Sequence, residues 1–239
     1  MKLIENIGIL GDEMKEAIII FTRVPIPGQT KTRLEGFLTK NQCAEIHTSF
    51  LKDIKNTCEK TSKDIFIFYT PEDANNILIS ILGNKYEYKK QHGNDLGEKM
   101  YNAIDYVLSK KYKSCILIGT DIPYIKVEDI DKSFEILKNK DIVLGPTIDK
   151  GYYLVGMKKA TKSIFENIEY GHGNVLDNTI ESIKNSNLTY DLTNENIDID
   201  EREDIIYFYN EIKSKNISED KYTSKFIVNI IEEHKRECL

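Results

Sequence analysis

Residues 115–123 read Cys-Ile-Leu-Ile-Gly-Thr-Asp-Ile-Pro, an unbroken apolar run that ends in a short turn with an acidic residue. Three similar apolar runs lie at residues 17–21, 65–68 and 142–144. None of them alternates apolar with polar side chains, as a strand with one face in water would. Because continuous apolar runs of this length are typical of strands covered on both faces, we expect four buried strands of a parallel sheet.

Patterns of helical spacing separate these runs. Apolar residues recur on one helical face between residues 41 and 60, and Thr39, with a glutamine three residues later, forms a capping-box pattern. Thr70-Pro71 predicts the start of a second helix, with a capping residue before a proline. Residues 94–110 carry a third apolar stripe. The alternation of strand and helix predicts an α/β protein: a three-layer α/β/α fold with an open, mostly parallel sheet.

The chain is expected to form a single domain over residues 1–239. Its core would occupy about residues 16–212, followed by a polar surface loop at 213–225 and an amphipathic C-terminal helix at 226–239. This helix either docks on the domain or contacts another subunit, and the second alternative would make a homodimer.

Composition and length narrow the classes of partner. A formal net charge of −6 over 239 residues argues against a nucleic acid or an anionic membrane as the main partner. The longest aliphatic runs are about five residues, far short of the roughly 20 that a transmembrane helix needs. The opening residues, with Glu5 and Asn6, lack the hydrophobic region of a signal peptide, and the four cysteines show no CxxC spacing. We therefore expect a cytoplasmic protein without a membrane span.

The loop after residues 17–21 is the first candidate site, because open parallel sheets bind ligands at the carboxyl ends of their strands. It holds two prolines, a glycine, three threonines and three cations. Phosphate groups bind to fixed backbone N–H donors and to Lys or Arg side chains. We interpret the loop as a phosphate site, with an ordinary basic turn as the alternative. Its candidate residues are Thr22, Arg23, Pro25, Gly28, Lys31 and Arg33.

The second candidate is Asp121, which directly follows a central apolar run. A carboxylate at this place lies where a metal-bound diphosphate would lie, since Mg²⁺ or Mn²⁺ takes carboxylate oxygens together with substrate phosphates. Pro123 ends the strand and fixes the direction of the carboxylate. A helix-cap or turn aspartate is the alternative.

Residues 143–156, Val-Leu-Gly-Pro-Thr-Ile-Asp-Lys-Gly-Tyr-Tyr-Leu-Val-Gly, predict two strands that meet at a tight turn. Gly145 and Gly151 would let the backbone approach a ligand closely. Tyr152 and the tyrosine after it would point to opposite faces, one into the core and the other toward the cleft. A plain β-hairpin is the alternative, which accounts for the glycines and leaves Asp149 unexplained.

Residues 198–204, Asp-Ile-Asp-Glu-Arg-Glu-Asp, join a predicted strand end to a helix start. One of these aspartates would supply a second metal ligand; an acidic first helical turn is the equally weighted alternative. The histidines point to no hydrolytic or zinc site, because no HExxH pattern or nucleophile accompanies them. We expect His47 on a helix surface, and His92 and His172 in loops that could face the cleft.

Taken in this order, the segments resemble a family of uncharacterised bacterial GT-A-like transferases of the DUF2064 type, described as glycosyltransferases and in some members linked to arsenosugar biosynthesis. The resemblance spans about residues 17–205, and its most specific part is the segment Gly-Pro-x-x-Asp-x-Gly-Tyr-Tyr-Leu. The matching segments are Lys31–Leu34, Asp95–Met100, Gly119–Pro123, Val143–Gly156 and Asp198–Ile205.

The resemblance implies the GT-A fold of nucleotide-diphospho-sugar transferases, which is also similar to guanylyl- and cytidylyltransferases. By that similarity the first loop would hold the base and the phosphates, Asp121 the metal ion and Asp200 a second bond to metal. Asp149 would lie on the sugar or acceptor side, where Lys150 replaces the glycine usual in the family. The other nucleotide-binding residues that it implies are Asp95, Gly119, Thr120, Gly145, Gly151 and Tyr152.

The first functional hypothesis is a glycosyltransferase. A Mg²⁺ or Mn²⁺ ion on Asp121 would neutralise the departing nucleoside diphosphate, with Lys31 and Arg33 stabilising its charge. Asp149 would bind or activate the acceptor hydroxyl. The alternative is a nucleotidyltransferase that joins an NTP to a phosphorylated acceptor and releases pyrophosphate; a catalytically silent nucleotide-binding protein is a third reading. The expected partners are a nucleotide sugar or NTP and a small-molecule acceptor.

Overall fold

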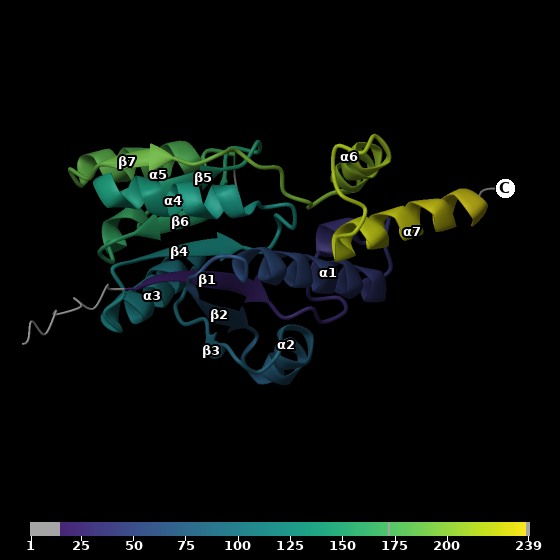
Figure 1. Cartoon of the computed structure of the whole chain (residues 1–239), viewed down its shortest axis with the longest axis horizontal. Helices are drawn as coiled ribbons and strands as arrows, with labels where there is room; N and C mark the ends of the chain where they lie inside the picture. The colour runs from purple at the N-terminus through teal and green to yellow at the C-terminus, as the bar shows by residue number, and fades with distance from the viewer. Residues whose placement is uncertain (1–14, 172, 238–239) are drawn as a thin grey trace, which may run out of the picture.

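The four apolar runs form strands of one sheet in the computed structural model, which describes residues 15–171 and 173–237 (Figure 1). The expectations for the opening residues and for His172 fall outside these ranges. The runs lie in β1 (Glu16–Arg23), β2 (Asp64–Thr70), β4 (Ser114–Gly119) and β5 (Ile142–Pro146). The sheet also contains β3 (Glu87–Lys90), β6 (Tyr152–Met157) and β7 (Tyr190–Leu192).

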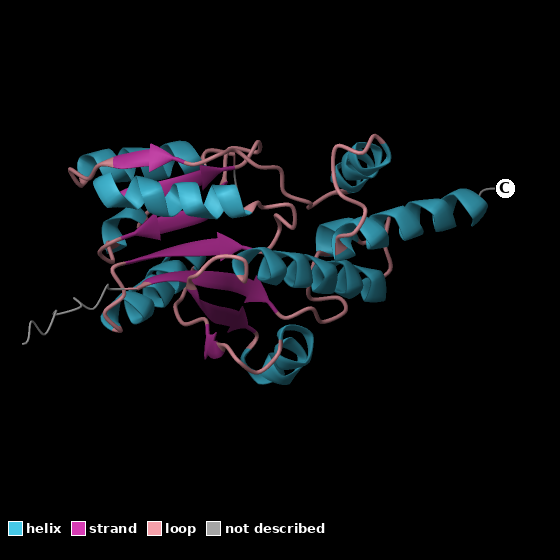
Figure 2. Cartoon of the chain, in the orientation of Figure 1, coloured by secondary structure: helices cyan, strands magenta, loops and turns pink. Residues whose placement is uncertain are grey.

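The strand order is β3-β2-β1-β4-β6-β5-β7, which confirms the predicted open sheet. Paired strands are parallel except where β6 runs antiparallel to β4 and β5. The arrowheads in Figure 2 show the carboxyl ends of the parallel strands at one edge of the sheet. The chain leaves β1 toward β2 and returns on its other side with β4, so the strand order reverses between β1 and β4. Such a switch point is where open α/β sheets bind ligands.

Helices cover both faces of the sheet (Figure 1). One face carries α1 (Lys40–Cys58), α2 (Asn75–Leu82) and α4 (Val127–Asn139). The other carries α3 (Leu96–Ser109) and α5 (Val175–Asn185). Ile18 and Ile19 belong to different cores, because successive side chains of a strand point to opposite faces. The unbroken apolar runs therefore supply both layers of packing.

The helix starts agree only in part with the sequence prediction. The capping box is confirmed, since the Thr39 hydroxyl accepts the N–H of Gln42 and the Gln42 side chain accepts the N–H of Thr39. The start at Thr70-Pro71 is wrong: Thr70 still pairs with β1 as the last residue of β2, and α2 begins at Asn75 after a short 3₁₀ turn. Within the described ranges, no helix combines the length and apolar character needed to cross a membrane.

The C-terminal helices dock on the domain, beyond the carboxyl edge of the sheet (Figure 1). α6 (Arg202–Lys213) and α7 (Tyr222–Glu237) share a third hydrophobic cluster with α1, in which Phe50, Phe208 and Ile227 are buried. The last helix begins at Tyr222, inside the segment predicted as a loop. The buried carboxylate of Asp53 in α1 explains this early start, because it accepts the N–H groups of Tyr222 and Thr223 at 3.1 and 2.8 Å.

Replacing Asp53 by alanine is expected to destabilise the protein by about 1–3 kcal/mol, because the start of α7 loses a charged acceptor for one buried and one partly buried N–H group. Urea unfolding measures the difference. An exposed aspartate on α3, Asp105, provides the matched control; its alanine variant should lie within about 0.5 kcal/mol of wild type. Equal effects of the two substitutions would show that Asp53 does not hold α7.

Candidate functional site

A cleft of about 550 Å³ opens at the carboxyl ends of β1 and β4, at the switch point of the sheet. Its volume lies in the range of small-molecule sites. The loop after β1, the start of α3 and the segment before α6 bound it. The predicted residues that line it are Thr22, Arg23, Lys31, Arg33, Gly119, Thr120, Asp121, Tyr152 and Asp200.

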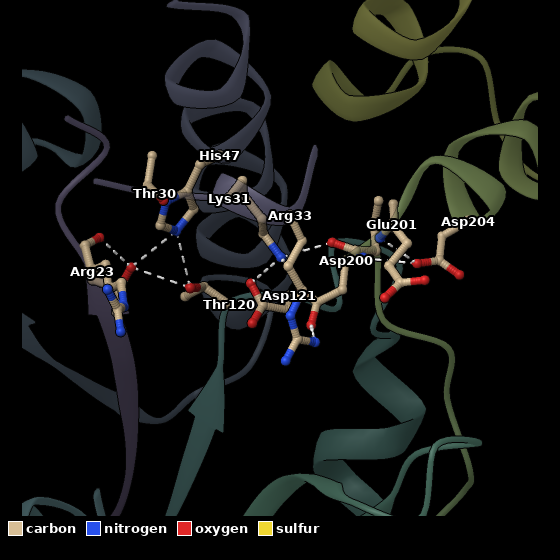
Figure 3. A network of polar contacts seen from close by, with 12 residues as sticks. Arg23, Thr30, Lys31, Arg33, His47, Thr120, Asp121, Asp200, Glu201 and Asp204 are labelled. Carbon is tan, nitrogen blue, oxygen red and sulfur yellow. Dashed lines mark hydrogen bonds and ion pairs between the residues drawn. The ribbon is translucent and has the colours of Figure 1, made fainter. Parts of the chain in front are cut away.

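Lys31 is the electrostatic centre of the cleft. Its side chain is 5% exposed, and its ammonium lies 2.5 Å from Asp121 Oδ1 and 2.8 Å from Asp200 Oδ1 (Figure 3). Burial lowers the pKa of Lys31, but the two carboxylates outweigh it and raise the pKa above its ordinary value, so the group stays a cation. The guanidinium of Arg33 approaches Asp200 from the solvent side, at 3.4 Å. The predicted phosphate lysine and both predicted metal ligands thus meet at one point.

A backbone hydrogen bond of Ile199, the residue before Asp200, holds this segment next to Asp121. Ile199 is fully buried, and its N–H donates to the carbonyl of Asp121 at 2.9 Å. Asp204 then starts α6 by accepting the N–H groups of Asp200 and Glu201 at 2.9 and 2.7 Å. The segment therefore contains both a strand-end carboxylate in the cleft and an acidic helix start, in different residues.

A further carboxylate, Asp198, lies near this cluster; it belongs to the candidate segment 198–204, in which the sequence prediction chose Asp200 as the metal ligand. Burial raises its pKa to about 6, with added contributions from Asp149, Asp200 and Asp121. The sequence contained a signal for it, because residues two apart in an extended chain point to the same side. Asp198 therefore lies close enough to Asp200 and Asp121 for their charges to raise its pKa.

Pro25 and Gly28 shape the first loop without lining the cleft. Pro25 is buried, and Gln29 donates its N–H to the carbonyl of Ile26 at 3.0 Å, which closes a turn. Gly28 lies in this turn with a φ of 75°, a left-handed conformation that favours glycine. The residues that follow this turn line the cleft.

Asp95 and Gly145 also lie outside the cleft lining. Asp95 caps α3, with its Oδ1 accepting the N–H of Glu98 at 2.8 Å. A Cβ at Gly145 would come within 2.7 Å of the Tyr153 ring, so this glycine is required by packing inside the hairpin. Neither residue touches the cleft where the sequence places a ligand.

Asp149 caps its own turn between β5 and β6. Its Oδ1 accepts the Thr147 hydroxyl at 2.5 Å and the N–H of Gly151 at 3.0 Å. Asp149 and Gly151 do not line the cleft, although Asp149 is close enough to raise the pKa of Asp198. Lys150 has a φ of 68°, the left-handed conformation in which the glycine of the resembled family would be unstrained. The turn therefore lies near Asp198 but does not line the cleft.

One wall of the cleft is apolar. Phe21, Met100 and Leu117 line it next to the charged end, together with Tyr152. Tyr152 packs with the α3 and α5 side of the sheet and Tyr153 with the α1 and α4 side, which confirms their opposite directions. An apolar wall beside a cluster of charges suits a ligand with one ring and one strongly charged group.

The expectation of a surface position for His47 is wrong: its side chain is 2% exposed and forms part of the cleft lining. Thr22 at the end of β1, Thr30 in the loop after it and Thr120 after β4 surround the imidazole, and an apolar pattern does not count threonines. Burial lowers the pKa of His47 to about 3, and Lys31 and Arg23 contribute in the same direction. His92 is exposed and does not line the cleft.

His47 predicts a loss of stability in mild acid. The pKa of His47 is about 3 in the folded chain and 6.5, its ordinary value, in the unfolded chain. Between these two pH values the unfolded state therefore binds one more proton than the folded state. The contribution of the neutral imidazole to the free energy of unfolding is fully present above about pH 6.5 and is lost as the pH falls toward 3. Between pH 7 and pH 5, urea unfolding should show wild type losing about 2 kcal/mol more than His47→Gln. Parallel pH profiles would contradict the neutral, buried imidazole.

Comparison with known proteins adds a family and a set of relatives. A family model described as "Uncharacterized protein conserved in bacteria (DUF2064)" matches residues 54–172. A 2-phospho-L-lactate guanylyltransferase of Methanosphaera stadtmanae is 24% identical over 233 residues, covering 92% of this chain and 96% of that protein. The protein of the same name from Methanobrevibacter smithii is 27% identical over 151 residues, covering 62% of this chain and 66% of that protein.

Two solved structures have a fold similar to that of this chain. A protein from Desulfovibrio desulfuricans G20, assigned to the nucleotide-diphospho-sugar transferases, is 28% identical with a TM-score of 0.85, covering 91% of this chain and 97% of that one. A cytidylyltransferase from Leptospira borgpetersenii is 17% identical with a TM-score of 0.53, covering 94% and 95%, and shares the fold alone. Residues 54–172 match the DUF2064 family, and the chain has the fold of the nucleotide-diphospho-sugar transferases.

Proposed function

We propose that the protein is a metal-dependent nucleotidyltransferase, which joins an NTP to a phosphorylated small-molecule acceptor and releases pyrophosphate. The observation that carries this proposal is the meeting of Lys31 with Asp121 and Asp200 at the switch point of the sheet. The relatives named guanylyltransferases support nucleotidyl transfer over the glycosyl transfer first expected from the sequence. GTP is for the same reason the first nucleotide to test.

In this reaction a phosphate oxygen of the acceptor attacks the α-phosphorus of the NTP. The bond from that phosphorus to the α,β-bridging oxygen breaks, and pyrophosphate leaves with the electron pair. Lys31 and Arg33 would bind the phosphate oxygens on which negative charge accumulates, and Arg23 offers a further guanidinium at the cleft wall. The apolar wall with Phe21 and Met100 would hold the base.

The donor set suits a hard divalent cation. Asp121 and Asp200 direct one oxygen each at the same point, which the ammonium of Lys31 now occupies. The charges of these two aspartates also raise the pKa of the nearby Asp198. Mg²⁺ or Mn²⁺ is held in this way by one or two carboxylates together with substrate phosphates. Bound there, the ion would neutralise charge on the triphosphate. Asp121 and Asp200 would orient it, and Lys31 would move to the phosphates.

Glycosyl transfer from a nucleotide sugar is the second candidate, because the D. desulfuricans protein of the same fold is assigned to the nucleotide-diphospho-sugar transferases. The two reactions differ in the donor and in the leaving group. Asp149 would then serve the acceptor, from its turn beside the carboxylates.

A thermal-shift panel of four NTPs and several nucleotide sugars, each with and without Mn²⁺, tests the proposal. A ligand at 100 times its Kd adds about 2.7 kcal/mol, which for a chain of this length raises Tm by about 5–10 °C. We expect the largest Mn²⁺-dependent shift with one NTP. Shifts confined to nucleotide sugars would favour glycosyl transfer, and no shift with any nucleotide would favour the catalytically silent reading.

A further inference from the structure

His47, in the lining of the cleft, contacts three separate segments of the chain (Figure 3). Its Nδ1 contacts the hydroxyl of Thr30 in the loop after β1. Its Nε2 lies 3.3 Å from the hydroxyl of Thr22 at the end of β1 and 3.2 Å from that of Thr120 after β4. All three threonines are buried, with exposed fractions of 2%, 2% and 5% for Thr22, Thr30 and Thr120.

The available hydrogens fix the direction of these bonds. Thr22 uses its hydroxyl hydrogen on the carbonyl of Arg23, at 2.7 Å, so it can only accept from Thr120 or from His47. A neutral imidazole with its hydrogen on Nε2 then satisfies every contact. Thr30 donates to Nδ1, Nε2–H donates to the threonine pair, and Thr120 donates to Thr22 at 3.2 Å. With its hydrogen on Nδ1, the ring would leave the Thr22–Thr120 contact without a hydrogen.

Each of these threonines immediately precedes a residue of the cleft. Arg23 follows Thr22, Lys31 follows Thr30 and Asp121 follows Thr120. Consecutive Cα atoms are about 3.8 Å apart, so holding a threonine holds the backbone from which the next side chain projects. The imidazole is therefore the shared support of three charged groups that come from different parts of the sheet.

We propose that His47 is a positioning residue, which fixes the backbones that carry Lys31 and Asp121 relative to each other through Thr30 and Thr120. The role deepens the nucleotidyl transfer proposed above and rests on it for its kinetic consequence. A proton-transfer role does not fit, because both ring nitrogens are engaged and burial, together with Lys31 and Arg23, holds the pKa of His47 low. Positive charge on the ring would also remove the acceptor of the Thr30 hydroxyl.

Three variants separate positioning from simple packing. His47→Leu removes every hydrogen bond of the ring, whereas His47→Gln keeps an amide that donates and accepts. Leu51→Ala is the matched control, since Leu51 is fully buried on the same helix and packs in the α1 and α4 core away from the cleft lining. We expect His47→Leu to lower kcat by about 10- to 100-fold with a smaller change in KM for the NTP, as misplacement by about 1 Å does. His47→Gln should recover most of kcat, and Leu51→Ala should keep it although it lowers Tm.

A second readout needs no turnover. The ammonium of Lys31 is buried between two carboxylates, so its ¹⁵N–¹H signal should exchange slowly in wild type and in Leu51→Ala. In His47→Leu that signal should be lost or shifted, and His47→Gln should restore it. An unchanged Lys31 signal and a kcat equal to that of Leu51→Ala would overturn the positioning role. If wild type turns over no NTP, the proposed function fails, while the Lys31 signal still decides the role of His47.

Discussion

Replacing Asp121 by asparagine is expected to lower metal-dependent turnover by roughly a thousandfold. A metal ion contributes several kcal/mol of charge stabilisation in the transition state, and each 1.36 kcal/mol corresponds to a factor of ten. The substitution removes one of the two carboxylates that converge on Lys31 and keeps the shape of the side chain. Steady-state rates at saturating Mn²⁺ and NTP measure the loss.

The fold should survive this change, because the side chain of Asp121 is 49% exposed and its structural bond to Ile199 comes from the backbone carbonyl. Asp131, an exposed residue of α4, provides the matched control, and Asp131→Asn should keep wild-type rates. Full activity of Asp121→Asn with normal dependence on Mn²⁺ would show that the metal is bound elsewhere or is not used.

Lys31→Met is expected to change metal binding and nucleotide binding in opposite directions. In wild type, the ammonium occupies the point on which Asp121 and Asp200 converge, so a cation must displace it. Without that charge the two carboxylates are left to a divalent ion, and Mn²⁺ alone should bind about tenfold more tightly, a difference of about 1.4 kcal/mol. Turnover should fall by at least about a hundredfold, since the phosphates lose a charged donor in a water-poor site.

Electron paramagnetic resonance of free Mn²⁺ measures the first effect without any substrate. Lys99→Met is the comparison, because Lys99 lines the same cleft from α3 and forms no ion pair with Asp121 or Asp200. It should leave Mn²⁺ affinity unchanged. Weaker Mn²⁺ binding by Lys31→Met would mean that the lysine does not stand where the metal goes.

The sheet was predictable because its signal is local. Ala17–Phe21 and Cys115–Ile118 are continuous apolar runs, and burial on both faces leaves no other pattern for such strands. The placement of Asp121 at a strand end near Lys31 followed from the rule on ligand sites in open sheets. By contrast, the start of α7 at Tyr222 depends on Asp53, a carboxylate distant in sequence, and no local pattern contains that bond.

The buried position of His47 could not be predicted for the same reason, because its contacts come from residues distant in sequence. His47 looks like a helix-surface residue because its cover consists of threonines from two strand ends and a loop, which a search for apolar spacing passes over. Gly145 and Asp95 were assigned to the ligand because packing against Tyr153 and capping of α3 leave the same residue types in a sequence as a binding site does. The position of Asp198 was predictable, because it lies two residues before Asp200 and residues at this spacing in an extended chain point to the same side.

Product analysis by ³¹P NMR tests the central claim most directly. The protein with Mn²⁺ would be given GTP and a phosphorylated hydroxy acid, and in parallel a nucleotide sugar with the same acceptor. Nucleotidyl transfer predicts that the mixture with GTP, and not the mixture with the nucleotide sugar, forms pyrophosphate and a new diphosphate-bridged product. The Asp121→Asn variant should form neither. Release of a nucleoside diphosphate from the nucleotide sugar, with the NTP left intact, would contradict it.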